Sequence, residues 1–73
     1  MPRHGSGSNR LRPTKHQIRA AREYSGLTQS EADEIVWRSK GVWKRWESGQ
    51  YPIDMAAWEL FLFKTGQHDE YFA

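Results

Sequence analysis

Apolar residues recur at helical spacing in four stretches of the chain, and residues suited to helix ends separate these stretches. The first two stretches each begin at a capping box, Thr14 to Gln17 and Thr28 to Glu31, whose side chains can satisfy free backbone N–H groups. The first predicted helix runs over 14–25 and stops at Gly26, which can adopt a left-handed conformation. The second predicted helix is short, and its inward-facing residues are Ala32, Ile35 and Val36.

The third stretch predicts an amphipathic helix over about 40–47, with Ser39 as its N-cap and Gly49 after its end. Trp43 and Trp46 fall on one side of this helix. The opposite side carries Gly41, Lys44 and Arg45, with Lys40 and Val42 at the flanks. We therefore expect the two indole rings in the core and the cations in solvent.

The fourth stretch predicts a helix that is capped by Asp54 and ends near Lys64, before Gly66. One apolar stripe consists of Met55, Trp58, Phe61 and Leu62, and a second consists of Ala56, Leu60 and Phe63. Only one stripe can face the core of its own domain. The second stripe is expected to form a homodimer interface; the alternative is that Tyr71 and Phe72 of the C-terminal tail fold back over it.

These patterns predict an all-α fold, a compact bundle of four to five helices with a helix-turn-helix at its centre. The expected organisation is a flexible basic arm over 1–13, one domain over 14–66 and a short tail over 67–73. With 73 residues the chain has a thin core, which favours self-association.

Composition narrows the possible chemistry. The chain has no cysteine, so disulfides and thiolate zinc sites are excluded, and its three histidines are too far apart for a local metal motif. No convincing acid, base and nucleophile cluster is present, so we expect neither an enzyme nor a metal, cofactor or small-molecule site. No apolar run is long enough to span a membrane, and we expect a cytoplasmic protein.

The net charge is only +2, but the charges are unevenly distributed. Residues 1–22 carry six Lys or Arg and no acid, and residues 35–46 carry four more, again with no acid. Two separate basic blocks indicate a polyanionic partner. A solvated surface of mixed charge is the simpler alternative.

The segment GLTQSEADEIVWRSKGVWKRWESG, residues 26–49, resembles the helix-turn-helix of the Cro and lambda-repressor family, also called the XRE family. It aligns without a gap to the family pattern GLTQxxLAxxxGVSxxxIxxWExG, most closely at GLTQ, Ser39 and WESG. The continuation through PIDMAAWELFLFKTG is similar to small phage-encoded regulators, including anti-CRISPR-associated repressors. The likeness covers about residues 14–66, and it implies a protein of the cytoplasm of a bacterium or a phage-infected host.

The resemblance implies roles for individual residues. Gln29 would contact a DNA phosphate, and Arg22 would form a structural ion pair with Glu47. The base-reading residues would be Lys40, Gly41, Val42, Lys44 and Arg45, where Arg45 can fork onto a guanine and Val42 can touch a thymine methyl group. Further phosphate contacts are expected from Arg10, Arg12, Lys15, Arg19, Arg38 and Ser39.

Three residues depart from the family pattern. Asp33 stands where the family has alanine, Ala32 where it has leucine, and Trp37 where the turn has glycine. A bulky residue at positive φ would cost on the order of 1 kcal/mol. We therefore expect that the turn differs here or that Trp37 avoids this conformation.

The function that these observations predict is sequence-specific binding of double-stranded DNA. The chain is expected to act as a dimeric, autoregulatory repressor at an inverted-repeat operator, with helix 40–47 in the major groove. One alternative is an antitoxin-like or other partner-binding module that also binds DNA. RNA binding is a third possibility.

Overall fold

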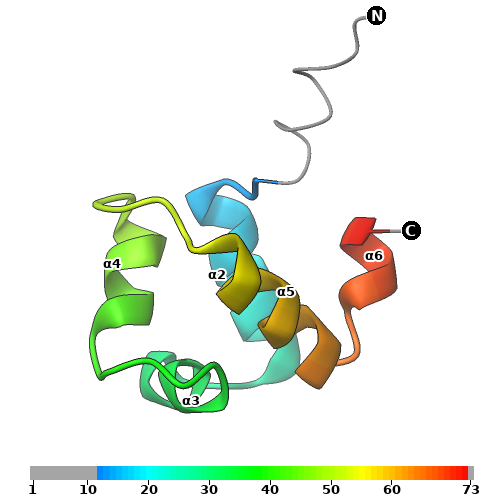
Figure 1. The fold of residues 1–73 in the computed structure, drawn as a ribbon, viewed down its shortest axis with the longest axis horizontal. Coiled ribbons are helices and arrows are strands. Elements are labelled where there is room, and N and C mark those ends of the chain that lie inside the picture. Colours follow the sequence, from blue (N-terminus) through cyan, green and yellow to red (C-terminus); the bar gives the residue numbers. More distant parts are fainter. Residues whose placement is uncertain (1–11, 73) are drawn as a thin grey trace, which may run out of the picture.

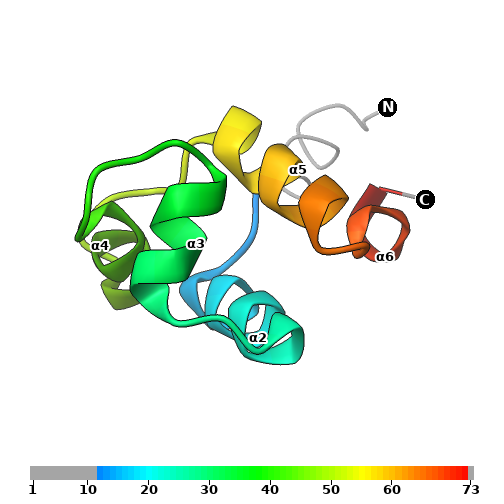
Figure 2. The same ribbon diagram turned by 90° about the horizontal axis from the view of Figure 1, so that it is seen from below.

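The regular structure of the described residues, 12–72 of the computed structural model, is entirely helical. The helices are α2 (Lys15–Ser25), α3 (Gln29–Ile35), α4 (Val42–Ser48), α5 (Met55–Lys64) and α6 (His68–Phe72). Helices α4 and α6 lie at opposite ends of the molecule, with α5 between them (Figure 1 and Figure 2). The predicted all-α bundle of four to five helices is therefore confirmed for this part of the chain, whereas almost all of the predicted basic arm lies outside the described residues.

Helix starts follow the predicted caps in three cases. The hydroxyl of Thr14 accepts from the Gln17 N–H at 3.1 Å, and the Gln17 side chain accepts from the Thr14 N–H at 2.9 Å. Thr28 and Glu31 form the same reciprocal pair at 3.1 and 2.9 Å. Asp54 caps α5 through its carboxylate. These contacts satisfy donors that the first turn of a helix leaves free.

Helix ends share one hydrogen-bonding pattern at four places. A residue with positive φ donates its N–H to the carbonyl three positions back, and the next N–H reaches the carbonyl five positions back. Gly26, Gly49 and Gly66 occupy the positive-φ position after α2, α4 and α5. Trp37 occupies it after α3, with a φ of 60°. The expectation that Trp37 would avoid this conformation is therefore wrong. The positive φ of Trp37 lets the N–H groups of residues 37 and 38 donate to the last carbonyls of α3.

The start of α4 also differs from the prediction. The helix begins at Val42 rather than near residue 40, and its N-cap is Gly41 at a φ of 96°. Ser39 does not cap it; the Ser39 carbonyl instead accepts from the Val42 N–H at 3.2 Å. Gly41 is therefore not a mid-helix residue. A glycine suits this position because its φ lies in a region that side chains disfavour.

The core is built around aromatic side chains from α4 and α5. Trp43 and Phe61 are fully buried, with ring centroids 4.5 Å apart. Trp43 also meets Trp46 edge to face at 5.6 Å, and Trp58 is buried beside them in the same cluster. The predicted inward orientation of the α4 tryptophans is confirmed, and Trp58 packs in the core as expected.

The segment expected to be a short tail is part of the folded domain as far as residue 72. Gln67 is buried and donates through its side-chain amide to the Ala21 carbonyl at 3.0 Å. Tyr71 of α6 meets Trp58 of α5 edge to face at 5.1 Å. The domain boundary predicted at residue 66 therefore lies inside this packed unit. The tail thus folds back onto α5, but this contact of Tyr71 is with Trp58 of the first apolar stripe rather than with the second stripe.

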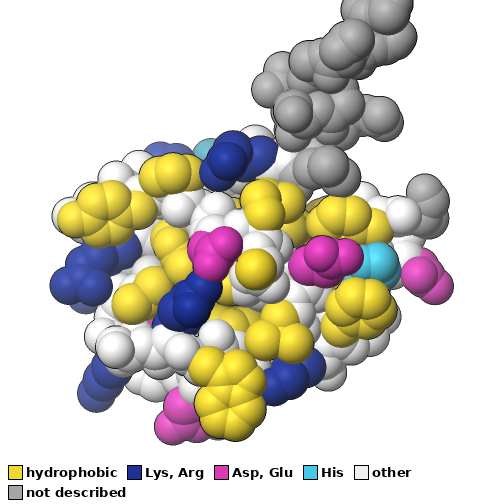
Figure 3. Space-filling model, in the orientation of Figure 1, with side chains coloured by type: hydrophobic (Ala, Val, Ile, Leu, Met, Phe, Trp, Pro, Cys, Tyr) yellow, Lys and Arg dark blue, Asp and Glu magenta, His cyan; other side chains and the backbone are white. Residues whose placement is uncertain are grey.

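The fold-back covers only part of the second apolar stripe of α5. Leu60 is half-buried and packs against the core, but Ala56 is exposed and Phe63 keeps 60% of its surface exposed. The Phe63 ring stacks on the His68 ring, with centroids 3.9 Å apart. Hydrophobic side chains remain on the surface of this face of the molecule (Figure 3). Part of this stripe therefore remains open to a partner.

Candidate nucleic-acid interface

Helix α4 separates its aromatic and cationic side chains onto two faces. Trp43 and Trp46 are buried, whereas Lys44 and Arg45 are exposed, as the helical pattern predicts. Lys40 precedes the helix and is also exposed. The helix thus packs on the core through its indoles and presents its cations to solvent.

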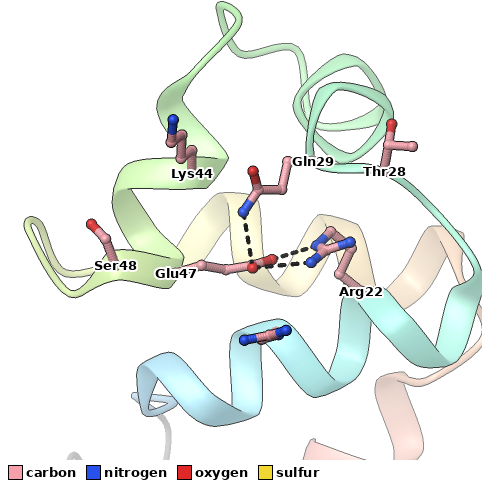
Figure 4. Close-up of a pocket in the computed structure, with 7 residues that line it drawn as sticks. Arg22, Thr28, Gln29, Lys44, Glu47 and Ser48 are labelled. Carbon is pink, nitrogen blue, oxygen red and sulfur yellow. Dashed lines mark hydrogen bonds and ion pairs between the residues drawn. The ribbon is translucent and has the colours of Figure 1, made fainter.

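Two shallow hollows flank Lys44. Gly41, Lys44 and Arg45 line one of them, together with Ser48 and Gln50. The other lies between α2, α3 and α4 (Figure 4). Its lining residues are Arg19, Arg22, Thr28, Gln29, Lys44, Glu47 and Ser48. Val42, by contrast, is half-buried and packs against the core, so it is less available to a ligand than the sequence predicts.

A single carboxylate joins three helices at the second hollow. Glu47 accepts two hydrogen bonds from the Arg22 guanidinium, at 2.5 Å from Nε and 3.1 Å from Nη2. It also accepts from the Gln29 amide at 3.0 Å and from the Trp43 indole N–H at 2.6 Å. Arg22 further donates to the Leu27 carbonyl at 2.9 Å. The ion pair implied by the family resemblance is present, and it connects α2 to the end of α4 (Figure 4).

The ionisation of this pair follows from the same contacts. Burial alone would raise the pKa of Glu47, but the hydrogen bonds from Arg22, Gln29 and Trp43 together lower this pKa below its ordinary value. The hydrogen bond to Glu47 raises the pKa of Arg22, and this effect outweighs its burial. Both groups are therefore charged at neutral pH.

Gln29 has a different environment from the one expected. Its side-chain NH₂ is directed to Glu47 rather than to solvent (Figure 4). It nevertheless lines the hollow together with Thr28 and Lys44. A ligand at the hollow would therefore meet a Gln29 that the Glu47 carboxylate already orients.

The other predicted phosphate contacts fall into three groups. Arg19 and Arg38 form ion pairs on the surface, with Glu23 and Asp54 respectively. Arg12 donates to the Ile53 carbonyl at 3.4 Å. The prediction for Arg10 lies outside the described residues, and Ser39 and Lys15 are exposed. The chain thus places its predicted phosphate contacts in several surroundings rather than in one patch.

Four exposed Lys or Arg side chains form neither an ion pair nor a hydrogen bond within residues 12–72, whereas the exposed Arg12 and Lys64 donate to backbone carbonyls. The four are Lys15, Lys40, Lys44 and Arg45. Three of the four belong to α4 or to the segment just before it. Basic side chains accordingly mark the edge of the molecule that α4 forms, at the left of Figure 3.

Sequence reasoning missed the role of Asp33. This residue is 2% exposed, and its two carboxylate oxygens accept from the Gly41 N–H at 2.9 Å and the Trp43 N–H at 2.7 Å. Asp33 therefore supplies the cap that α4 lacks in its own sequence. The available signal was a carboxylate where the family pattern has alanine, directly after the inward-facing Ala32 of a predicted helix.

Within the described residues, no three His, Asp or Glu side chains lie close enough together to hold a metal ion. Over the same residues, no helix combines the length and the apolar character needed to cross a membrane.

Comparison with known proteins adds no assignment: no protein-family model, curated protein or solved structure matches this chain.

Proposed function

We propose that this chain is a sequence-specific, double-stranded DNA-binding regulator that inserts the exposed face of α4 into the major groove. The observation that carries the proposal is the division of α4 into a buried indole face and an exposed face with Lys44 and Arg45. The major groove of B-DNA is about 12 Å wide and admits one α-helix. A helix that is held by one face and cationic on the other suits this groove.

Within this proposal, the cations have distinct tasks. Arg45 presents a planar fork that matches O6 and N7 of guanine, whereas Lys40 and Lys44 are point charges that serve either guanine or phosphate. Gly41 brings backbone close to the DNA without a side chain, at a position where its φ already requires glycine. Gln29, Arg12, Lys15 and Arg19 supply contacts to the phosphate backbone at the edges.

The Glu47 cluster supports the same proposal by holding α4 in place. A reading helix is useful only if its orientation is reproducible to a fraction of a base-pair step. Arg22 and Gln29 hold the C-terminal end of α4 through Glu47, and they come from two other helices. The carboxylate network thus restrains the helix that carries the reading side chains.

One short helix covers too few base pairs for secure specificity, so the proposal includes a homodimer. A two-fold dimer would place two α4 helices in successive major grooves, roughly 34 Å apart, on an inverted repeat. The exposed Ala56 and Phe63, with the half-buried Leu60, are the proposed dimer surface. Repression is the regulatory mode expected for a regulator of this size, because occupancy of a promoter is sufficient, and control of its own operon is what the family resemblance implies.

The test is selection of bound duplexes from a random library, followed by Arg45→Ala and Lys44→Ala. Loss of preference at one base position in each half-site, worth about 1–3 kcal/mol, is expected for a base-reading residue. Lys64→Ala is the control, since it removes the same charge from the end of α5. If the two substitutions weaken binding equally for all sequences, Lys44 and Arg45 contact phosphate rather than bases. If the wild-type chain selects no duplex, the proposal is contradicted.

A second candidate is a module that binds DNA and also holds another protein. Three large side chains favour it, because Tyr24, Trp37 and Phe63 are exposed beyond what a monomer requires. An antitoxin-like regulator would use such side chains to bind its partner. Co-purification of one unrelated protein at a fixed ratio, lost in Trp37→Ala, would favour this candidate over a simple homodimer.

A further inference from the structure

The N-terminal end of α4 is held by a side chain from another helix. Gly41, the N-cap residue, forms no side-chain cap, and the nearby Ser39 does not replace it. The Gly41 and Trp43 N–H groups instead donate to separate oxygens of the Asp33 carboxylate in α3. Charge-assisted bonds of this kind are short and about twice as strong as neutral ones. A negative charge is also favourable beside the first turn of a helix.

Asp33 also fixes the end of its own helix. Its backbone carbonyl accepts from the Arg38 N–H at 2.9 Å, in the pattern that closes α3. The same residue therefore holds both ends of the 36–41 connection, the first through its carbonyl and the second through its carboxylate. Few other side chains can accept both hydrogen bonds, because two diverging N–H donors require two acceptor oxygens on one short side chain.

The clamp lies next to the proposed reading side chains. A Cβ atom added to Gly41 would lie 3.6 Å from Nη1 of Arg45, so the Arg45 guanidinium packs beside the residue that Asp33 holds. Lys40 immediately precedes Gly41, and Lys44 lies one turn beyond it. Two bonds to the first turn restrict both the rotation of α4 about its axis and its angle to α3. The Glu47 network restrains the other end of the same helix.

We propose that Asp33 is a positioning residue that sets the base preference of α4 without touching DNA. It acts by fixing where Lys40, Lys44 and Arg45 point. This inference rests on the DNA-binding function proposed above and deepens it. It assigns sequence discrimination partly to a buried carboxylate on α3, at a position where a helix-turn-helix of this pattern has alanine.

The first measurement concerns the clamp in the free protein. In Asp33→Asn, one of the two acceptor oxygens becomes an NH₂ group that faces an N–H donor. We expect amide hydrogen exchange at Gly41 or Trp43 to quicken by about tenfold or more, while the Ala21 amide in α2 keeps its rate. If each of the three amides exchanges at the same rate in Asp33→Asn as in the wild type, Asp33 does not hold α4, and the inference is overturned.

The second measurement separates positioning from general stability. Affinity is compared for the selected duplex and a scrambled duplex of equal length, at a temperature where circular dichroism shows each variant folded. Asp33→Asn is expected to reduce the ratio of the two affinities by about tenfold. When α4 is no longer held in orientation, its side chains lose their base-specific contacts, whereas contacts to phosphate persist on both duplexes. A purely structural role would weaken both duplexes by the same factor, and this result would overturn the proposal.

Two further variants complete the experiment. Asp69→Asn makes the same change of charge at a fully exposed side chain and should leave the ratio unchanged. If Asp33→Asn does not fold, Asp33→Glu retains the carboxylate but lengthens it by one methylene, and a shifted base preference is expected. An unchanged preference in Asp33→Glu would count against the proposal. If the wild-type chain selects no duplex at all, the proposed function fails, whereas a selective wild type with an equally selective Asp33→Asn removes only this inference.

Discussion

Trp37 adopts a left-handed backbone conformation, which is occupied by glycine at the comparable ends of α2, α4 and α5. A left-handed residue with a side chain costs roughly 1–2 kcal/mol. Burial does not offset this cost, because the side chain is 78% exposed. The Lys64 ammonium lies 4.9 Å from the ring centroid, a contact worth about 0.5–1 kcal/mol at an exposed site. The two charge-assisted bonds of Asp33 further stabilise this connection.

Two substitutions separate the strain at Trp37 from the contacts of its ring. Trp37→Gly and Trp37→Ala both remove the ring, but only glycine adopts a positive φ without strain. We expect the glycine variant to be more stable than the alanine variant by about 1 kcal/mol, measured by urea unfolding. Equal stability of the two variants would mean that the connection relaxes to another conformation when the ring is absent.

At the scale of whole helices, the junction between α2 and α4 depends on one ion pair. The Arg22 side chain is 15% exposed and the Glu47 side chain 6%. Removing one partner of such a pair is expected to cost about 2–4 kcal/mol, because the other is left charged and poorly hydrated. Gln29 and Trp43 would lose their acceptor as well. The junction is thus stabilised by several contacts that fail together.

The same junction makes folding stability depend on pH. The pKa of Glu47 is lower in the folded chain than its ordinary value of 4.5. Its contribution is therefore fully present above about pH 4.5 and is lost as the pH falls through the folded-state pKa. Glu47→Gln is expected to lower the free energy of unfolding at pH 7, and to make it fall less steeply below pH 4.5, in denaturant titrations across this range.

The control for this prediction is Glu70→Gln, at an exposed position of α6. Its profile should follow that of the wild type. Parallel profiles for the Glu47→Gln variant and the wild type below pH 4.5 would contradict the assignment of the pKa shift to folding.

For the whole molecule, the small net charge hides an electrostatic division. The net charge of +2 is compatible with many partners, but three of the four exposed Lys or Arg side chains that form neither an ion pair nor a hydrogen bond within residues 12–72 lie on or just before α4. Such a surface attracts a polyanion locally, and the attraction weakens with salt. Two consequences for the assembled protein follow.

The first consequence concerns salt. If the dimer neutralises 6–10 phosphates, the affinity for the selected duplex should fall by about 10³–10⁵ between 50 and 200 mM salt. Fluorescence anisotropy over this range measures the slope of log affinity against log salt. Lys44→Ala should make this slope shallower by about 2 for a dimer, one unit for each protomer, if Lys44 binds phosphate. An affinity that does not change with salt would contradict the electrostatic basis of the proposal.

The second consequence concerns the proposed dimer. Phe63→Glu places a charge in the exposed part of the α5 stripe, and is expected to raise the dimer dissociation constant by about tenfold or more. Sedimentation equilibrium measures this constant. Tyr51→Glu is the matched control, since Tyr51 is an exposed aromatic residue before α5. An unchanged constant in Phe63→Glu would move the interface away from this stripe.

The sequence alone was sufficient for the features that depend on neighbours within a turn or two. The Thr14 and Thr28 capping boxes, the end of α2 at Gly26 and the inward tryptophans of α4 are local signals, and all are present in the structure. The extent of α5 followed in the same way from its cap and its periodicity.

Only the tertiary structure decided the features that depend on residues distant in the chain. The start of α4 was mispredicted because its cap comes from Asp33 of α3 rather than from Ser39. The C-terminal segment became a helix because Trp58 and the Ala21 carbonyl offer it partners. A local pattern records which groups need a partner, but which partner satisfies them depends on how the helices pack in three dimensions.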